Sequence, residues 1–207
     1  INGSSSLDDL RLLPLGEASL LPPDNGLSSR VIWGGADTSL TRVATPLMLS
    51  GFTPQAIERF EPQFRALGLV PMQGGGGGTA SSDGSPKMPE PGSMISVQLV
   101  RGDMGVSADG TVTLVDRGRI YAFGHPFLSA GPTEIPFGES RVIASVASYS
   151  NSMKLTTAGP FLGVIQSDSS SGVFGTIGGQ AHMIPVDMDL ESQNGTNYSY
   201  HFEVAND

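Results

Sequence analysis

The chain has 207 residues, of which 28 are glycine and 15 are proline, while only 15% are charged. Its formal net charge of -9 argues against a nucleic-acid-binding protein, which would need a basic patch. The absence of cysteine excludes disulfides, thiolate metal ligands and a cysteine nucleophile. This composition favours short strands joined by many turns over long helices.

The first 72 residues are predicted to form an irregular connecting region that contains one helix. Thr53 and Pro54 supply a helix N-cap and a first-turn proline, and apolar residues then recur on one helical face. We therefore expect a short helix near residues 53–67, which Pro62 should kink or divide, because proline removes a backbone donor from the helix interior. Elsewhere in this region, short apolar stretches are broken by proline and glycine.

Residues 73–93 are predicted to form a flexible linker or mobile loop. Five consecutive glycines are followed there by serine, aspartate and proline, so the segment has almost nothing to bury. The linker would divide the N-terminal region from a β-rich domain over residues 94–207.

Short apolar runs with turn signals about every ten residues predict that the last domain is a sandwich or a barrel. The runs expected to form strands are 94–100, 110–115, 119–124, 141–149, 161–166, 172–178, 183–190 and 198–204. No run approaches the roughly 20 apolar residues that a membrane-spanning helix needs, so no transmembrane segment is expected.

His125 is the candidate catalytic residue. It directly follows a predicted strand, between Gly124, which permits a sharp turn, and Pro126, which restricts the backbone on the far side. A general base needs such a fixed aim, and histidine takes and returns a proton near neutral pH. By itself, however, this pattern favours a histidine that merely caps a loop.

The other histidines, His182 and His201, are predicted to be ordinary surface or strand-edge residues. Their spacing from His125 matches no metal-binding motif, so no metal site is expected. Residues 168–172 read Asp-Ser-Ser-Ser-Gly, which lacks the glycine that precedes a trypsin-like nucleophile. We interpret this segment as a solvated turn.

Four motifs follow one another between residues 94 and 186. They are Val100-Arg101-Gly102-Asp103 with Gly110-Thr111-Val112-Thr113, Ala122-Phe123-Gly124-His125-Pro126-Phe127, Ser152-Met153-Lys154-Leu155, and Gly172-Val173-Phe174-Gly175-Thr176-Ile177-Gly178 with Ile184-Pro185-Val186. Each motif is weak alone. In this order and spacing, they make the segment resemble the SpoIVB peptidase family of serine peptidases.

The resemblance implies a mainly β fold, a chymotrypsin-like β-barrel or barrel fragment of many short antiparallel strands. It places the family's catalytic histidine at His125, which reverses the preference for a loop-capping role. The family also implies regulatory cleavage or self-cleavage of a protein or peptide by a bacterial protein that is periplasmic, on the cell surface or secreted. Acyl transfer by a serine and a histidine needs no cofactor.

The sequence departs from the family at the nucleophile. The family's Gly-Met-Ser-Gly-Ser-Pro type of motif has no counterpart here, and neither does its catalytic aspartate. Because the chain opens on Ile1 and not on methionine, we expect it to be part of a longer precursor whose missing segment supplies the serine. The chain alone should then be inert toward peptide bonds.

Two other functions remain open. The first is a β-barrel that kept the fold and lost catalysis, and that serves as a binding or interaction module of an exported protein. The second is a carbohydrate-binding sandwich. It is the weaker reading, because Tyr198, Tyr200 and Phe202 alternate as on one strand face, which more often packs in a core than holds a sugar.

Overall fold

The structure is a computed structural model that describes most of the chain. The described residues are 30–33, 36–39, 44–74, 86–146 and 153–206. Contacts divide the chain into two units, Ile1–Thr41 and Arg42–Asp207. In the first unit, β1 (Arg30–Trp33) and β2 (Ala36–Ser39) form an antiparallel hairpin.

The second unit is mainly β, with a single helix among its described residues. Its elements, in chain order, are β3 (Thr45–Ser50), α1 (Pro54–Ala66), β4 (Leu69–Gln73), β5 (Met94–Gly102), β6 (Gly105–Asp116), β7 (Arg119–Ala122), β8 (Gly131–Val146), β9 (Met153–Ser169), β10 (Gly172–Ile177), β11 (Met183–Glu191) and β12 (Asn197–Ala205). Ten strands form one sheet in the order β11-β12-β5-β8-β9-β10-β7-β6-β3-β4. In the described part of the chain, no helix is long and apolar enough to cross a membrane.

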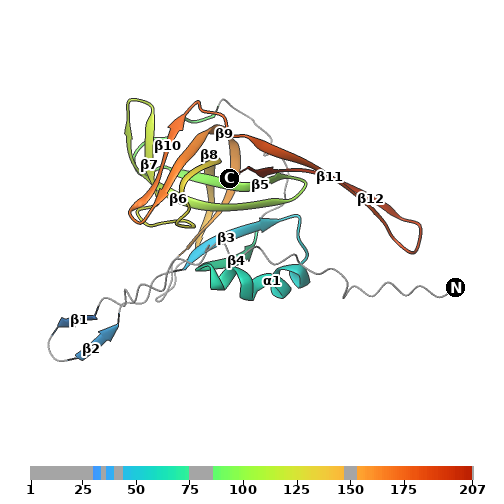
Figure 1. The fold of residues 1–207 in the computed structure, drawn as a ribbon, viewed down its shortest axis with the longest axis horizontal. Helices are drawn as coiled ribbons and strands as arrows, with labels where there is room; N and C mark the ends of the chain where they lie inside the picture. The colour runs from blue at the N-terminus through green and yellow to red at the C-terminus, as the bar shows by residue number, and fades with distance from the viewer. Residues whose placement is uncertain (1–29, 34–35, 40–43, 75–85, 147–152, 207) are drawn as a thin grey trace. The chain divides into compact units, whose positions relative to one another are not determined.

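Part of this sheet closes on itself. β5, β8, β9, β10, β7 and β6 are successive neighbours, and β5 also pairs with β6, so the series returns to its start. Every pair in this ring is antiparallel. The ring occupies the upper part of the ribbon in Figure 1. It confirms the expectation of a mainly β, barrel-like fold.

The helix α1 lies where the capping pattern predicts it. The Thr53 hydroxyl accepts a hydrogen bond from the backbone N–H of Ala56 at 3.2 Å, and Pro54 opens the first turn. The helix runs on through Pro62, which therefore does not divide it. It ends before Gly68, whose φ of +77° suits glycine and turns the chain into β4.

β3 and β4 lie in the region that the sequence analysis describes as irregular. In the chain, β3 precedes α1 and β4 follows it. The two strands pair in parallel, and β3 also pairs with β6 of the ring. Three alternate residues of β3, namely Thr45, Leu47 and Leu49, are buried. The sequence shows this alternation, but Pro46 stands between Thr45 and Leu47. Proline is usually rare in a paired strand, so the segment did not stand out as one.

β8 and β9 are longer than the runs that predicted them. β8 begins at Gly131, ten residues before the predicted start at Arg141, and contains Pro132 and Pro136. The register with β9 shifts at several points along the pair, including one between Pro132 and Ile135. Such irregularities accommodate residues that fit poorly into a regular ladder.

One apolar core joins the ring to β3, β4 and α1. Ile95 and Val97 of β5, Ile120 of β7 and Phe137 of β8 have no exposed surface. Burial of each such side chain contributes about 1.5–3 kcal/mol relative to an exposed position. The ring is therefore a stably packed scaffold that supports the loops at its ends.

The predicted linker is described only in part, since residues 75–85 lie outside the described residues. Its last residues pack against the ring. Gly92 donates to the carbonyl of Val112 at 2.9 Å, Val112 donates to the carbonyl of Ser93 at 2.9 Å, and Pro89 is buried. The proposed division between residues 1–72 and 94–207 stays a prediction.

β11 and β12 form a hairpin that extends away from the ring in Figure 1. It is joined to the ring where Phe202, Glu203 and Val204 pair with β5. The strands are in register along their whole length, from Met183 opposite Ala205 to the turn.

Candidate functional site

The turn that carries His125 has an unusual backbone. It follows β7, and its first two residues, Phe123 and Gly124, have φ angles of +75° and +73°. A positive φ is strained for phenylalanine, and the neighbouring packing holds it. The Phe123 N–H donates to the carbonyl of Thr111 at 3.0 Å. The Phe123 ring also lies so close to Gly110 that an added Cβ there would be 1.7 Å from a ring carbon.

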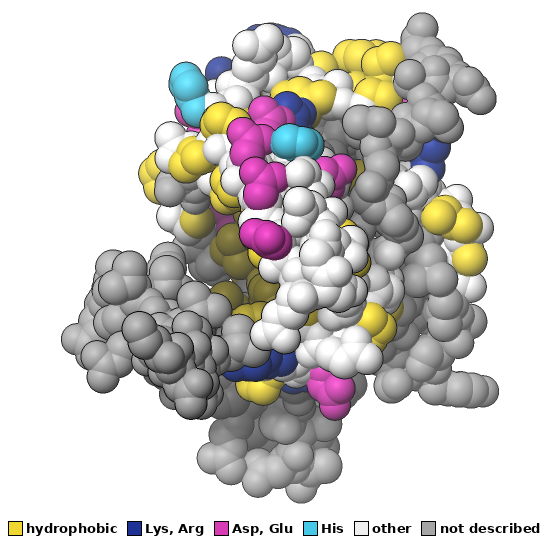
Figure 2. Space-filling view, turned by 90° about the vertical axis from the view of Figure 1, so that its right-hand side faces the viewer, with side chains coloured by type: hydrophobic (Ala, Val, Ile, Leu, Met, Phe, Trp, Pro, Cys, Tyr) yellow, Lys and Arg dark blue, Asp and Glu magenta, His cyan; other side chains and the backbone are white. Residues whose placement is uncertain are grey.

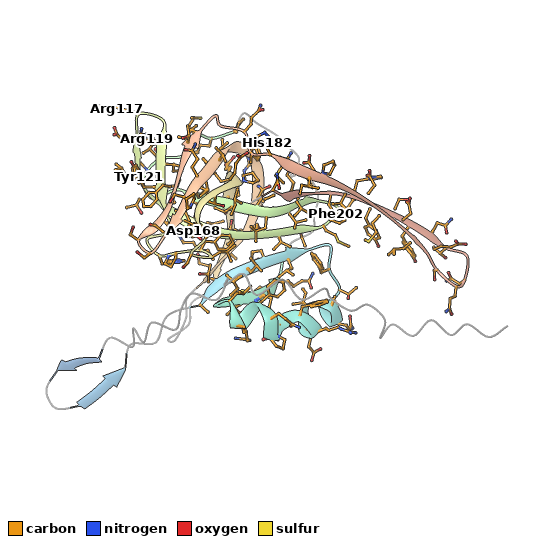
Figure 3. All side chains as sticks on the ribbon, viewed as in Figure 1. Arg117, Arg119, Tyr121, Asp168, His182 and Phe202 are labelled. Carbon is orange, nitrogen blue, oxygen red and sulfur yellow. The ribbon has the colours of Figure 1, made fainter. Side chains whose placement is uncertain are left out.

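A buried carboxylate holds the other side of the turn. Asp168, near the end of β9, is 1% exposed, and its Oδ1 accepts from the Phe127 N–H at 2.8 Å. Its Oδ2 accepts from the N–H groups of Leu128 at 2.5 Å and Ala130 at 3.3 Å. Figure 3 shows Asp168 within the ring. Three backbone donors on one carboxylate tie residues 127–130 to β9.

Aromatic packing completes the anchor. The Phe127 side chain is 2% exposed, and its ring meets that of Phe123 edge-on with centroids 6.0 Å apart. The Phe123 ring also lies 5.6 Å from the His125 ring. His125 is therefore the exposed apex of a turn whose two flanks are packed and hydrogen-bonded.

The imidazole of His125 has a defined orientation. Its Nδ1 lies 2.8 Å from the carbonyl oxygen of Pro126. A carbonyl can only accept, so the neutral ring must carry its proton on Nδ1 to make this bond. Nε2 is then the unprotonated nitrogen and can act as a base. In the serine-peptidase arrangement a carboxylate orients Nδ1, whereas here a backbone carbonyl does so.

The serines after Asp168 form the turn between β9 and β10. The Ser169 hydroxyl donates to the carbonyl of Gly172 at 3.2 Å and lies 3.1 Å from the Ser171 hydroxyl. Ser170 and Ser171 are exposed. These hydroxyls make contacts within the turn, and no bond joins any of them to His125.

The other two histidines lie outside this turn, each beside a carboxylate. His182 Nδ1 is 2.6 Å from Glu134, and His201 Nδ1 is 2.6 Å from Asp187. The backbone N–H of His182, and then its side chain, lower the pKa of Glu134. The hydrogen bond that the His201 ring donates to Asp187 raises the pKa of His201. Across the described ranges, no three His, Asp or Glu side chains are placed to hold a metal ion.

A second carboxylate, the half-buried Asp109 of β6, was not singled out from the sequence. The Thr156 hydroxyl donates to its Oδ2 at 2.7 Å, and the hydroxyls of Ser96 and Ser140 lie nearby without a well-formed bond. Burial raises the pKa of Asp109 more than these hydroxyls lower it. This cluster belongs to the wall of the ring.

Asp168 is the residue that the sequence analysis missed. Within Asp-Ser-Ser-Ser-Gly it was interpreted as part of a solvated turn, but it is buried and anchors a loop about 40 residues earlier in the chain. The serine part of that interpretation agrees with the exposed turn. The only signal for Asp168 was a lone carboxylate at the end of an apolar run.

The fold and the site define a mainly β, barrel-like domain that presents one oriented histidine, His125, on a turn. We call this turn clamped, because Asp168 and the packed rings of Phe123 and Phe127 hold its two flanks. No family model, no curated protein and no solved structure matches the chain.

Proposed function

We propose that this chain is the histidine-bearing part of a SpoIVB-like serine endopeptidase of an exported bacterial protein, with regulatory cleavage or self-cleavage as its task. The single observation that carries the proposal is the oriented ring of His125 on its clamped turn. The motifs that resemble the family supply the reaction class. The histidine within those motifs is His125, and its exposed imidazole is the one that the turn orients.

In this mechanism Nε2 of His125 takes the proton of a serine hydroxyl as that oxygen attacks the peptide carbonyl. It then returns the proton to the leaving amine. The Pro126 carbonyl stabilises the charged ring while it holds both protons. The serine comes from another segment of the same precursor, because this sequence lacks the nucleophile motif. The 207-residue chain alone is inert toward peptide bonds.

An inactive binding or interaction module is the second candidate. The observation that favours it is the β11–β12 hairpin, where no residue is buried and Ile184, Leu190 and Tyr198 each have nearly half of their surface exposed. Exposed apolar residues in one patch are typical of a surface that meets a partner.

Labelling of the complete precursor by a fluorophosphonate separates the two candidates, because this probe reacts with an activated serine. Three proteins are compared: the native precursor, His125→Ala, and His182→Ala as the matched control, since His182 is also exposed and bonded. We expect labelling of the native and His182→Ala proteins and loss of at least about 100-fold in His125→Ala. A folded native precursor without labelling would overturn the peptidase proposal and favour the binding module.

A further inference from the structure

A pocket of about 360 Å³ lies beside the first residues of β5. Its wall is formed by residues 87–89 and 92–94 together with parts of β8 and β9. The volume is at the lower end of the range for small-ligand sites. It is large enough for one or two amino-acid side chains and the backbone between them.

The pocket gathers positive charge in an acidic protein. The sequence contains only two lysines, Lys87 and Lys154, and both line this pocket together with Arg141. The chain as a whole has a formal net charge of -9. Glu139 also lines the pocket, so three cations face one carboxylate there, and this excess of positive charge favours an anion.

The three cations differ in their partners. Arg141 lies 3.3 Å from Glu139, and Lys87 lies 3.3 Å from Glu90. The Lys154 ammonium lies 3.6 Å from the sulfur of Met94. Among the described residues no carboxylate pairs with Lys154, and a thioether is a weak acceptor. Lys154 is therefore the cation with the most to gain from an incoming carboxylate.

Besides Ser93, Ser140 and the carboxylate of Glu139, much of the remaining lining is apolar. Met88 is 59% exposed and Val142 is 45% exposed, and Met94 and Leu162 complete this part of the wall. Methionine side chains adapt readily to ligands of varied shape. A matching ligand therefore combines one carboxylate with apolar atoms next to it, as an acidic residue with an apolar neighbour does in a peptide.

The pocket is close to the His125 turn through β6. Met94 of the pocket pairs with Thr111 of β6, whose carbonyl accepts from Phe123 of the turn. Met94 and Phe123 thus flank Thr111 on opposite edges. Two strand spacings put their backbones about 10 Å apart, a distance that about three extended residues span.

We propose that this pocket is a substrate subsite that binds the carboxylate of an acidic side chain, with Lys154 as its main cation. This inference rests on the proposed peptidase function and adds the substrate class: a peptide with Asp or Glu beside an apolar residue, a few residues from the bond to be cut. A peptide's C-terminal carboxylate offers the same chemistry, so the test must separate these two sources.

The test measures binding to the 207-residue chain by fluorescence anisotropy, with three labelled six-residue peptides of apolar residues. One has a central Glu and an amidated C-terminus, one has Gln in its place and is amidated, and one has Gln and a free C-terminus. We expect the Glu peptide to bind more tightly than both Gln peptides, and increasingly weakly as salt rises. Equal binding of the two amidated peptides, or no binding of any, would overturn the proposal, and tighter binding of the free C-terminus would reassign the carboxylate.

Lys154→Gln should weaken binding of the Glu peptide by about 3- to 10-fold and leave the Gln peptides unchanged. Arg117→Gln is the matched control. Its side chain is 92% exposed in the turn between β6 and β7 and does not line the pocket, so its affinity should equal that of the native chain. Circular dichroism checks that both variants are folded. An unchanged affinity in folded Lys154→Gln would contradict the proposal.

The two proposals fail in different ways. Peptide binding uses this chain and does not need the serine, so His125→Ala should bind the Glu peptide normally. Binding without labelling of the precursor would remove the peptidase function and with it the role of the pocket as a subsite. Labelling without selective binding would remove only the acidic substrate class.

Discussion

Two carboxylates of this protein contact chain-distant groups, but with very different environments. Asp168 in the ring is buried and accepts three backbone N–H groups. Asp187 in the β11–β12 hairpin is exposed and pairs with the imidazole of His201, which is exposed as well. A buried carboxylate with several donors determines a loop conformation, whereas an exposed ion pair contributes little to stability.

The surrounding structure differs in the same way. Residues around Asp168 belong to a closed ring with a common core, while β11 and β12 contain no buried residue. From Val186 to the turn and back to Phe202, the hairpin alternates between apolar and polar residues. One face is polar except for Met183, Pro185 and Ala205 at its base, and the other carries Ile184, Val186, Met188, Leu190, Tyr198, Tyr200, Phe202 and Val204.

Acidic side chains gather beside a histidine on the face of the molecule shown in Figure 2, and Figure 3 shows Phe202 on the projecting hairpin.

A two-stranded ribbon by itself is marginally stable in water. We therefore expect changes in the ring to affect the whole fold, and changes in the hairpin to stay local.

The largest effect is expected for Asp168→Ala. Three partly or fully buried N–H groups would lose their acceptor, at a total of about 3–5 kcal/mol of unfolding free energy. Amide exchange at Phe127 and Leu128 should also accelerate. Urea unfolding and hydrogen exchange measure both effects.

Asp116→Ala is the control for that experiment. Asp116, the last residue of β6, is 62% exposed, and its substitution should change stability by less than about 0.5 kcal/mol. If Asp168→Ala were as mild as this control, the carboxylate would not be the anchor of the His125 turn.

Asp109→Asn should change the unfolding free energy by less than Asp168→Ala does, and in the opposite direction. Burial raises the pKa of this carboxyl above its ordinary value of 3.8, so the folded state favours the protonated form. Stability is then lost as the pH rises from about 3.8 through the raised pKa. Asp109→Asn should be at least as stable as the native chain at pH 7 and should lose this part of the pH dependence.

Thermal unfolding between pH 3 and pH 8 measures that difference. Asn can still accept from the Thr156 hydroxyl, so the substitution keeps the bond that Asp109 makes. A less stable Asp109→Asn protein with an unchanged pH profile would show that the charged carboxylate is needed in the wall.

The smallest effect is expected in the hairpin. The bond to Asp187 raises the pKa of His201, so the pair favours the folded hairpin fully below the ordinary value of 6.5. This contribution is lost as the pH rises through the raised pKa. An NMR titration should show the His201 pKa falling toward 6.5 in Asp187→Asn, with no change in the amide signals of the ring.

Strand pattern made much of the ring and the hairpin predictable. Alternation in 94–100 and 198–204 marked β5 and β12, and the Thr53–Pro54 pair marked α1. β4 contains Pro71 within five residues, which hides so short a strand from a search for apolar runs. The sequence carries the local signals of strands and caps, but it gives no sign of which strands pair.

The candidate site shows the same limit. His125 stood out because glycine and proline flank it, and the structure places it at the apex of a turn. Asp168 did not stand out, because its role depends on the pairing of β9 with β8, where it lies opposite Gly131. No local pattern around Asp168 contains that information.

Nitrogen-15 NMR of the His125 imidazole in the 207-residue chain would show whether the clamped turn presents Nε2 as a base. At a pH where the imidazole is neutral, we predict a proton on Nδ1, bonded to the Pro126 carbonyl, and an unprotonated Nε2. A neutral ring protonated on Nε2 would contradict this prediction, because that nitrogen could then take no proton from a serine.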